Sequence, residues 1–129
     1  MKRGLAIILI VVAGLLMTSS LMFAHHGVGP FDLERTIDVK AKIIQFDFVN
    51  PHVEIYFEAP DDKGKVQKWV AESGSPNLLH RFGWSKDSLK PGDQVILTGN
   101  PSKTGAPNIR LLKVVFPDGR ELKPGSVYD

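Results

Sequence analysis

The sequence predicts an all-β domain with one short helix, built as a five-stranded OB-like barrel with the element order β-β-β-α-β-β. Two observations support this prediction. Segments that alternate apolar and polar residues, as half-buried strands do, occur three times before one short helical segment and twice after it. The first segment also changes phase midway, as a long strand that bends around a small barrel does. Another small barrel or a half-open sandwich with the same number of strands is the alternative.

The strands are placed by their alternation. In residues 36–48, every second residue from Ile37 to Ile43 is apolar, whereas Phe46 and Phe48 continue in the opposite phase. This change predicts a bulge or a sharp bend near Ile43–Ile44. Further strands are expected over residues 53–58 and 66–72, through Val95 and Leu97 to Gly99, and from Ile109 to Phe116.

A helix of about two turns is expected between the third and the fourth strand. Ser75 is a typical N-cap residue, Pro76 suits the first helical position, and Gly83 can end the helix. The apolar face of this helix would consist of Leu78, Leu79 and Phe82.

Turn residues and tryptophans complete the predicted framework. Gly92 and Asp93 are expected to turn the chain into the fourth strand, and Asp118–Gly119 is expected to form the last turn. Trp69, on the third strand, and Trp84, after the helix, are expected to fill the core or to cover the bottom of the barrel.

The start of the chain has the order of a secretory signal peptide: a basic beginning, an apolar run over residues 4–17, and a small residue at Ala24. Cleavage after Ala24 would make His25 the first residue, and cleavage after Ser20 is a competing prediction. A third alternative is an uncleaved anchor in the inner membrane, since a helix over residues 4–24 would be about 31 Å long. In each case the rest of the chain is expected in the periplasm, with the leader as its only membrane contact.

The chain of 129 residues therefore divides into a leader over residues 1–24, an N-terminal extension over 25–35, one barrel domain over 36–123 and a tail over 124–129. The leader contains Lys2 and Arg3, so the 16 basic residues become 14 without it, against 14 acidic ones. A domain without net charge or a basic cluster is a poor ligand for a phosphate backbone, which disfavours nucleic acid as a partner. The chain has no cysteine, which excludes disulfides, thiolate metal sites and cysteine nucleophiles.

His25, His26 and His52 are candidate metal ligands. If the leader is cleaved after Ala24, the free amine and the imidazole of His25 can chelate one metal ion. Copper(II) is the natural candidate for such a site, and zinc is the other. His52 would join this site only if the N-terminal segment runs back along the first strand. A solvated terminus with incidental histidines is the alternative.

Two loops form the candidate partner face. In OB folds, the loop between the first two strands and the loop between the last two lie beside the ligand. This places Asn50, Pro51 and His52 near a Gly- and Pro-rich loop that runs from Asn100 to Asn108. The second hypothesis is therefore an interaction module that binds a partner protein or an envelope glycan without metal.

An enzyme is not expected. Ser73 and Ser75 are not part of a G-x-S-x-G motif, and the chain has neither a Gly-rich phosphate loop nor an H-E-x-x-H helix.

The motifs of the chain are similar to those of a known family. Ala24-His25-His26 follows the leader, Asn50-Pro51-His52 follows the first strand, and Gly83-Trp84 follows the helix. In this order they resemble a family of small exported bacterial proteins, of proteobacterial type, that is known as a domain of unknown function. The resemblance covers nearly all of the mature chain and implies export, but no activity. The chain departs from the family at Met22, where such leaders carry a small residue.

The mass of the intact protein, recovered from the periplasm and measured in native and in denaturing solution, tests both the cleavage site and the metal. We expect a denatured mass that starts at His25, and a native mass that is larger by one copper or zinc ion. Equal native and denatured masses would contradict the metal hypothesis. A chain that starts at Leu21 would place the cut after Ser20.

Overall fold

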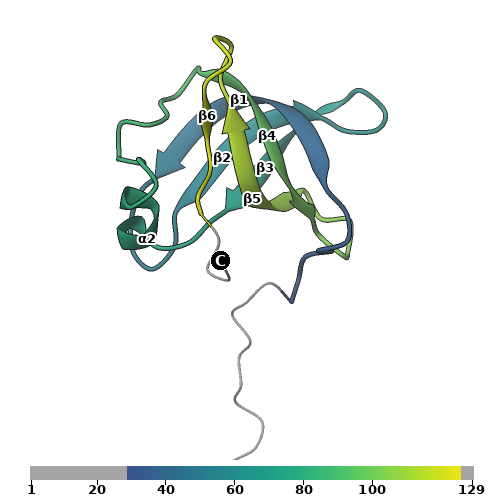
Figure 1. The fold of residues 1–129 in the computed structure, drawn as a ribbon. Coiled ribbons are helices and arrows are strands. Elements are labelled where there is room, and N and C mark those ends of the chain that lie inside the picture. The colour runs from purple at the N-terminus through teal and green to yellow at the C-terminus, as the bar shows by residue number, and fades with distance from the viewer. Residues whose placement is uncertain (1–28, 126–129) are drawn as a thin grey trace, which may run out of the picture.

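Six strands and one short helix form in the part of the chain that the structure, a computed structural model, describes, namely residues 29–125. The strands are β1 (Ile37–Asp47), β2 (Glu54–Pro60), β3 (Val66–Glu72), β4 (Gln94–Pro101), β5 (Asn108–Val115) and β6 (Glu121–Leu122). The helix, α2 (Pro76–His80), lies between β3 and β4 in the chain (Figure 1). The predicted order of elements is therefore confirmed, with β6 as an addition that the sequence did not predict.

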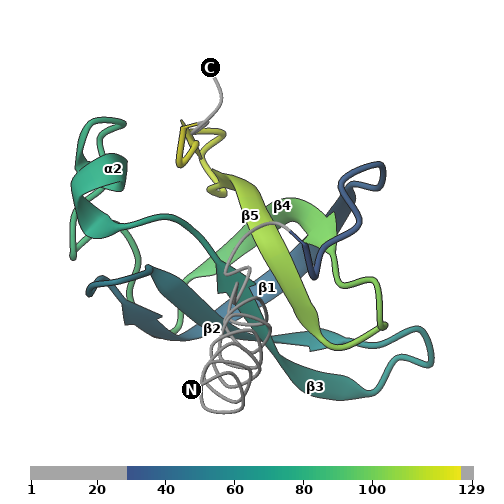
Figure 2. The ribbon, with the colours of Figure 1, turned by 90° about the horizontal axis from the view of Figure 1, so that it is seen from below.

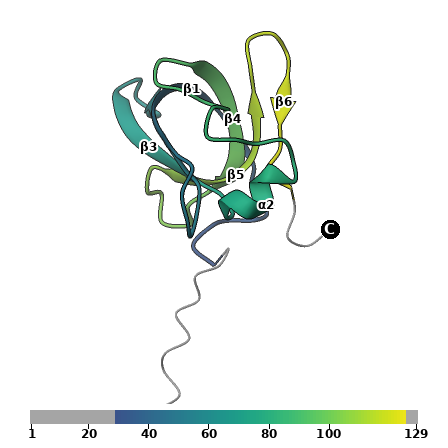
Figure 3. The same cartoon turned by 90° about the vertical axis from the view of Figure 1, so that its left-hand side faces the viewer.

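The strands curl into a barrel. Their order in the sheet is β3-β2-β1-β4-β5-β6, and an additional parallel pairing joins β3 to β5. This pairing closes the ring of β1 to β5, which Figures 2 and 3 show from two further directions. The predicted five-stranded OB-like barrel is confirmed, because its strand order and its parallel closing pair are those of that fold.

The predicted bend in β1 is present. Residues 37–42 of β1 pair with β4, and residues 42–47 pair with β2, so Lys42 has a partner on both sides. The register with β2 shifts between Ile43 and Gln45, and Ile44 is left without a partner. Such a bulge increases the local twist, which lets one bent strand pair with β4 along its first half and with β2 along its second half.

The core fills the inside of the barrel and includes aromatic side chains. Ile55 and Phe57 of β2 are buried, as their alternation with Glu54, Tyr56 and Glu58 predicts. Trp69 stacks on Phe57 with ring centroids 6.1 Å apart. Trp84 is buried, and its indole N–H donates to the carbonyl oxygen of Lys123 at 2.9 Å. Both tryptophans thus have the structural roles expected of them.

The helix begins as predicted but ends earlier. The side chain of Ser75 accepts a hydrogen bond from the amide of Leu78, Pro76 is the first helical residue, and Leu79 is buried. The sequence placed Phe82 on the apolar face of this helix, which is wrong. The helix stops at His80, the chain turns toward Gly83 at φ +85°, and Phe82 is 45% exposed.

The turn before β4 is formed by Gly92 and Asp93 as expected. Gly92 has a φ of +91°, which favours glycine, and the amide of Asp93 donates to the carbonyl oxygen of Lys90 at 3.1 Å. The same turn is bonded to the bend in β1, because the amide of Gly92 donates to Ile43 and the amide of Ile43 donates to Asp93. The turn therefore fixes the middle of β1.

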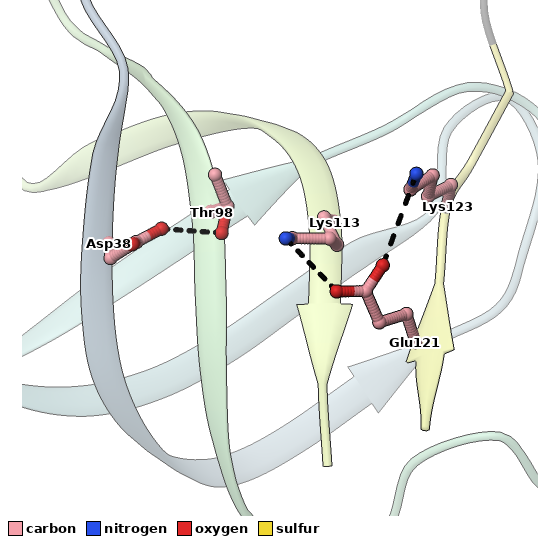
Figure 4. A network of polar contacts seen from close by, with 5 residues as sticks. All are labelled: Asp38, Thr98, Lys113, Glu121 and Lys123. Carbon is pink, nitrogen blue, oxygen red and sulfur yellow. Dashed lines mark hydrogen bonds and ion pairs between the residues drawn. The ribbon is translucent and has the colours of Figure 1, made fainter. Parts of the chain in front are cut away.

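The segments that precede β1 and follow β5 in the chain also pack against the barrel. Phe31, within the predicted extension, is buried and forms a β-bridge with Ser102. An ion pair at 3.1 Å between Lys113 of β5 and Glu121 of β6 joins these two strands. Glu121 also lies 3.9 Å from Lys123 (Figure 4).

The residues before 29, with His25, His26 and the leader, lie outside the described part. Between residues 29 and 125, no helix is long and apolar enough to span a bilayer.

The close approach of β4 and β5 at Gly99 predicts a stability effect. A Cβ atom at this position would overlap the carbonyl oxygen of Arg110. We expect Gly99→Ala to lower the free energy of unfolding by about 1–3 kcal/mol, as measured by urea denaturation. Gly29→Ala is the control, because a Cβ there would have nothing within 4 Å, and it should change the value by less than about 0.5 kcal/mol. Equal stabilities of the two variants would contradict the close approach.

Candidate functional site

The loop between β1 and β2 is held at both ends and exposed in the middle. Val49–His52, which we call the NPH loop, is exposed throughout, and Val49 has 59% of its surface accessible. The next residue, Val53, is buried. Its amide donates to the carbonyl oxygen of Gly74 at 2.9 Å, and its carbonyl oxygen accepts from the amide of Ser73 at the same distance. The C-terminal end of the loop is thus bonded to the segment between β3 and α2.

Aromatic rings hold the other end of the NPH loop. The ring of Phe48 meets the edge of His80 in α2 at 5.0 Å between centroids. Phe46 lies 5.7 Å from Phe48 and 6.2 Å from the buried Trp84. The loop therefore starts from a row of packed rings that leads back into the core, which restricts its motion.

The structure corrects the second half of the predicted partner face. Asn100 and Asn108 are not loop residues, because β4 continues through Asn100 and β5 begins at Asn108. Asn100 is only 3% exposed. Its side-chain amide donates to the carbonyl oxygen of Arg35 at 2.7 Å, and its side-chain oxygen accepts from Arg110 at 3.1 Å. The side-chain oxygen of Asn108 is also buried. Asn100 therefore belongs to the interior of the protein, and Asn108 is partly buried.

The loop over residues 102–107 lies on another side of the barrel from the NPH loop. The amide of Lys103 donates to Pro30, and the carbonyl oxygen of Pro107 accepts from the amide of Val70. In Figure 1 this loop is at the right, whereas α2, which Phe48 contacts just before the NPH loop, is at the left. The structure therefore does not bring His52 together with the Asn100–Asn108 segment. The NPH loop follows the end of β1 that lies beside α2.

The metal hypothesis depends on residues outside the described part. His25 and His26 lie there, so their distance to His52 stays open. Within residues 29–125, no three His, Asp or Glu side chains are grouped so that they could hold a metal ion. His52 is exposed in the NPH loop, and His80 is exposed beside Phe48. Copper(II) or zinc binding by the N-terminal histidines remains a prediction.

A row of carboxylates that the sequence analysis missed lies at the base of the NPH loop. Asp47 pairs with Glu54, and Glu54 pairs with Glu72, so three acidic residues are aligned across β1, β2 and β3. We call them the acidic row. Asp47 and Glu54 are also the strand residues on either side of the loop. None of the three forms an ion pair with another residue of the described part. Only the register, which the sequence does not reveal, aligns them.

The acidic row changes the ionisation of a neighbouring tyrosine. The hydroxyl of Tyr56 donates to Glu54 at 2.5 Å. This hydrogen bond raises the pKa of Tyr56 to about 12, and burial and the negative charges of Glu54, Asp47 and Glu72 act in the same direction. The face beside the NPH loop therefore has a negative potential and a neutral phenol over a wide pH range.

The comparisons with known proteins give a family and nothing further. The model of the family described as "Family of unknown function (DUF6152)" matches residues 12–109 of the chain. No curated protein and no solved structure matches the chain. The match agrees with the resemblance that the AHH, NPH and GW motifs indicate.

The bond between Tyr56 and Glu54 predicts a titration. The folded-state pKa of Tyr56 lies above its ordinary value, so the bond stabilises the fold fully below about pH 10 and is lost as the pH rises through about 12. Glu54→Gln should move the pKa of Tyr56 toward 10, as measured by tyrosinate absorbance in a Tyr128→Phe background. Glu58→Gln, on the same strand, is the control and should leave it near 12. An unchanged pKa in Glu54→Gln would contradict the assignment.

Proposed function

The chain belongs to this family of unknown function, and we propose that it is an exported, non-enzymatic interaction module that binds a partner protein in the periplasm. The binding surface is the NPH loop together with the acidic row. The leader over residues 1–24 supports export, and the partner is a segment of protein that carries lysine or arginine.

The anchoring of both ends of the NPH loop, at Phe48 and at Val53, is the observation that carries the proposal. An exposed loop whose two ends are already anchored loses less entropy on binding than a loop with free ends. Val49 and Pro51 offer apolar surface, and Asn50 and His52 offer polar groups beside it. Apolar anchors within a polar rim are the usual anatomy of a protein interface. The loop therefore has the properties of a recognition element.

The acidic row supports a basic partner. Three carboxylates without ion pairs in the described part lie next to the loop, and aligned like charges repel one another. A partner with lysine or arginine relieves this repulsion and gains electrostatic attraction that is strongest at low salt. An envelope glycan without positive charge does neither, so we favour a protein.

The two described histidines do not form the arrangement of a catalytic triad in residues 29–125. In a catalytic triad, a carboxylate that accepts a hydrogen bond from the imidazole orients the histidine as general base. Neither His52 nor His80 has a hydrogen bond to a carboxylate in residues 29–125. The proposal of metal binding through His25 and His26 is separate, since the interaction surface contains neither residue.

Site-specific photo-crosslinking in living cells tests the proposed surface. We expect benzoylphenylalanine in place of Val49 to yield a crosslinked protein, because this position lies in the NPH loop. Leu33 is the matched control, since it is 51% exposed but lies away from the loop, and it should not yield the same product. The product should be weakened by Glu54→Gln combined with Glu72→Gln.

Two results would contradict the proposal. Identical products from positions 49 and 33 would show that the NPH loop is not a specific surface. A product at position 49 that muramidase digests, and that contains no second protein, would show that the partner is a glycan.

A further inference from the structure

The first half of β3 is an open edge of the sheet. β3 pairs with β2 along its whole length, but with β5 only over residues 70–72. On the β5 side, the amide of Val70 donates to the carbonyl oxygen of Pro107. Backbone groups along a strand point to alternate sides, so those of Val66 and Lys68 also point away from β2. Neither residue has a backbone hydrogen bond on that side within the described part of the chain, and such an edge can pair with a further strand.

The two faces of this edge carry different side chains. Val66, which is 60% exposed, and Lys68, also exposed, lie on the outer face. Trp69 lies on the inner face, where it stacks on Phe57, and its indole N–H is buried without an acceptor in the described residues. A buried donor is rarely left without an acceptor. A strand added at this edge would place its side chains alternately on the face of Lys68 and on the face of Trp69.

The open edge carries positive charge. Lys65 and Lys68 are exposed, and neither forms an ion pair within residues 29–125. Glu58 is paired with Lys68 in the register of β2 and β3, which is the closed side of β3. The same edge of a second copy would bring two more lysines to this surface, and opposed like charges destabilise a strand pair. The charge therefore favours an acidic strand from a different protein.

We propose that residues 66–69 bind an extended, acidic segment of a partner protein by strand addition. The backbone of the partner bonds to the free amides and carbonyl oxygens of Val66 and Lys68. Its glutamate or aspartate side chains lie on the outer face beside Lys68. Valine or threonine alternates with them on the inner face, where a threonine hydroxyl offers the acceptor that Trp69 lacks. This inference is independent of the function proposed above, because residues 66–69 belong neither to the NPH loop nor to the acidic row.

Isothermal titration of the protein recovered from the periplasm with the synthetic peptide VETEVEV tests the inference. We expect saturable binding of one peptide. VKTKVKV has the same backbone with the opposite charge and should bind at least about tenfold more weakly. VETEVEV with every backbone amide N-methylated keeps its side chains but cannot donate to a strand, so it should not bind. Absence of saturable VETEVEV binding, or equal binding of either control peptide, would overturn the inference.

Amide hydrogen exchange locates the bound peptide. Saturating VETEVEV should slow the exchange of the Val66 and Lys68 amides at least about tenfold, because both point to the open edge. The amide of Lys86, between α2 and β4, is the control and should exchange at the same rate with and without peptide. Unchanged exchange at both Val66 and Lys68 would overturn the site.

Two variants separate the contribution of charge from that of the backbone. Lys68→Glu should weaken the binding of VETEVEV at least about tenfold and strengthen that of VKTKVKV. Lys86→Glu makes the same change in net charge at an exposed position away from β3 and should change neither affinity. Val66→Pro removes an outward donor at the first residue of an edge strand, where proline is tolerated, so it should weaken binding while the thermal unfolding curve is retained.

Unchanged affinity in both Lys68→Glu and Val66→Pro would overturn the site. Self-association of the protein that Val66→Pro abolishes would overturn the acidic partner in favour of a second copy of this chain.

Discussion

β1 bends at Ile43, and this bend determines where the NPH loop lies. Lys42, just before it, pairs with Glu58 of β2 on one side and with Gln94 of β4 on the other, so one strand belongs to both halves of the barrel. The backbone of Ile43 is bonded in both directions to the turn at Gly92–Asp93. Beyond the bend, Phe46 lies in the last part of β1. Phe48 follows β1, contacts His80 of α2 and precedes the NPH loop. Before the bend, Ala41 is buried in the core.

The two ends of the barrel differ in how they are stabilised. The end at α2 is covered by packed rings and by the bond from Trp84 to Lys123, and this rigid base supports an exposed loop. Elsewhere, β3 and β5 pair only over residues 70–72 and 108–110, so the start of β3 and the end of β5 are not joined to each other. The aligned carboxylates of Asp47, Glu54 and Glu72 repel one another and reduce stability. Local arrangements that oppose stability are expected where a protein binds something.

Most of the fold can be predicted from local patterns, whereas the site depends on register. The alternation through Ile37 and Phe46 predicted the bend, and Ser75–Pro76 predicted the start of α2. Asn100 looked like a loop residue because Gly99 and Pro101 flank it, but β4 continues through it. Its buried side-chain amide is hydrogen-bonded to Arg35 and Arg110. The acidic row depends on which residues face each other across strands. The bulge at Ile44 sets the pairing of Asp47 with Glu54, and the register between β2 and β3 sets that of Glu54 with Glu72. No periodicity in one strand contains that information.

The bonds of Ile43 and Val53 hold the two sides of the NPH loop to the barrel, and residue-resolved amide hydrogen exchange tests this anchoring most directly. The amides of Ile43 and Val53 are bonded and buried, so they should exchange only through global unfolding. The amides of Asn50 and His52, next to Val53 in the chain, should exchange close to the rate of an unprotected peptide. Exchange of Val53 or Ile43 as fast as that of His52 would contradict the account, because the loop would then have no fixed base.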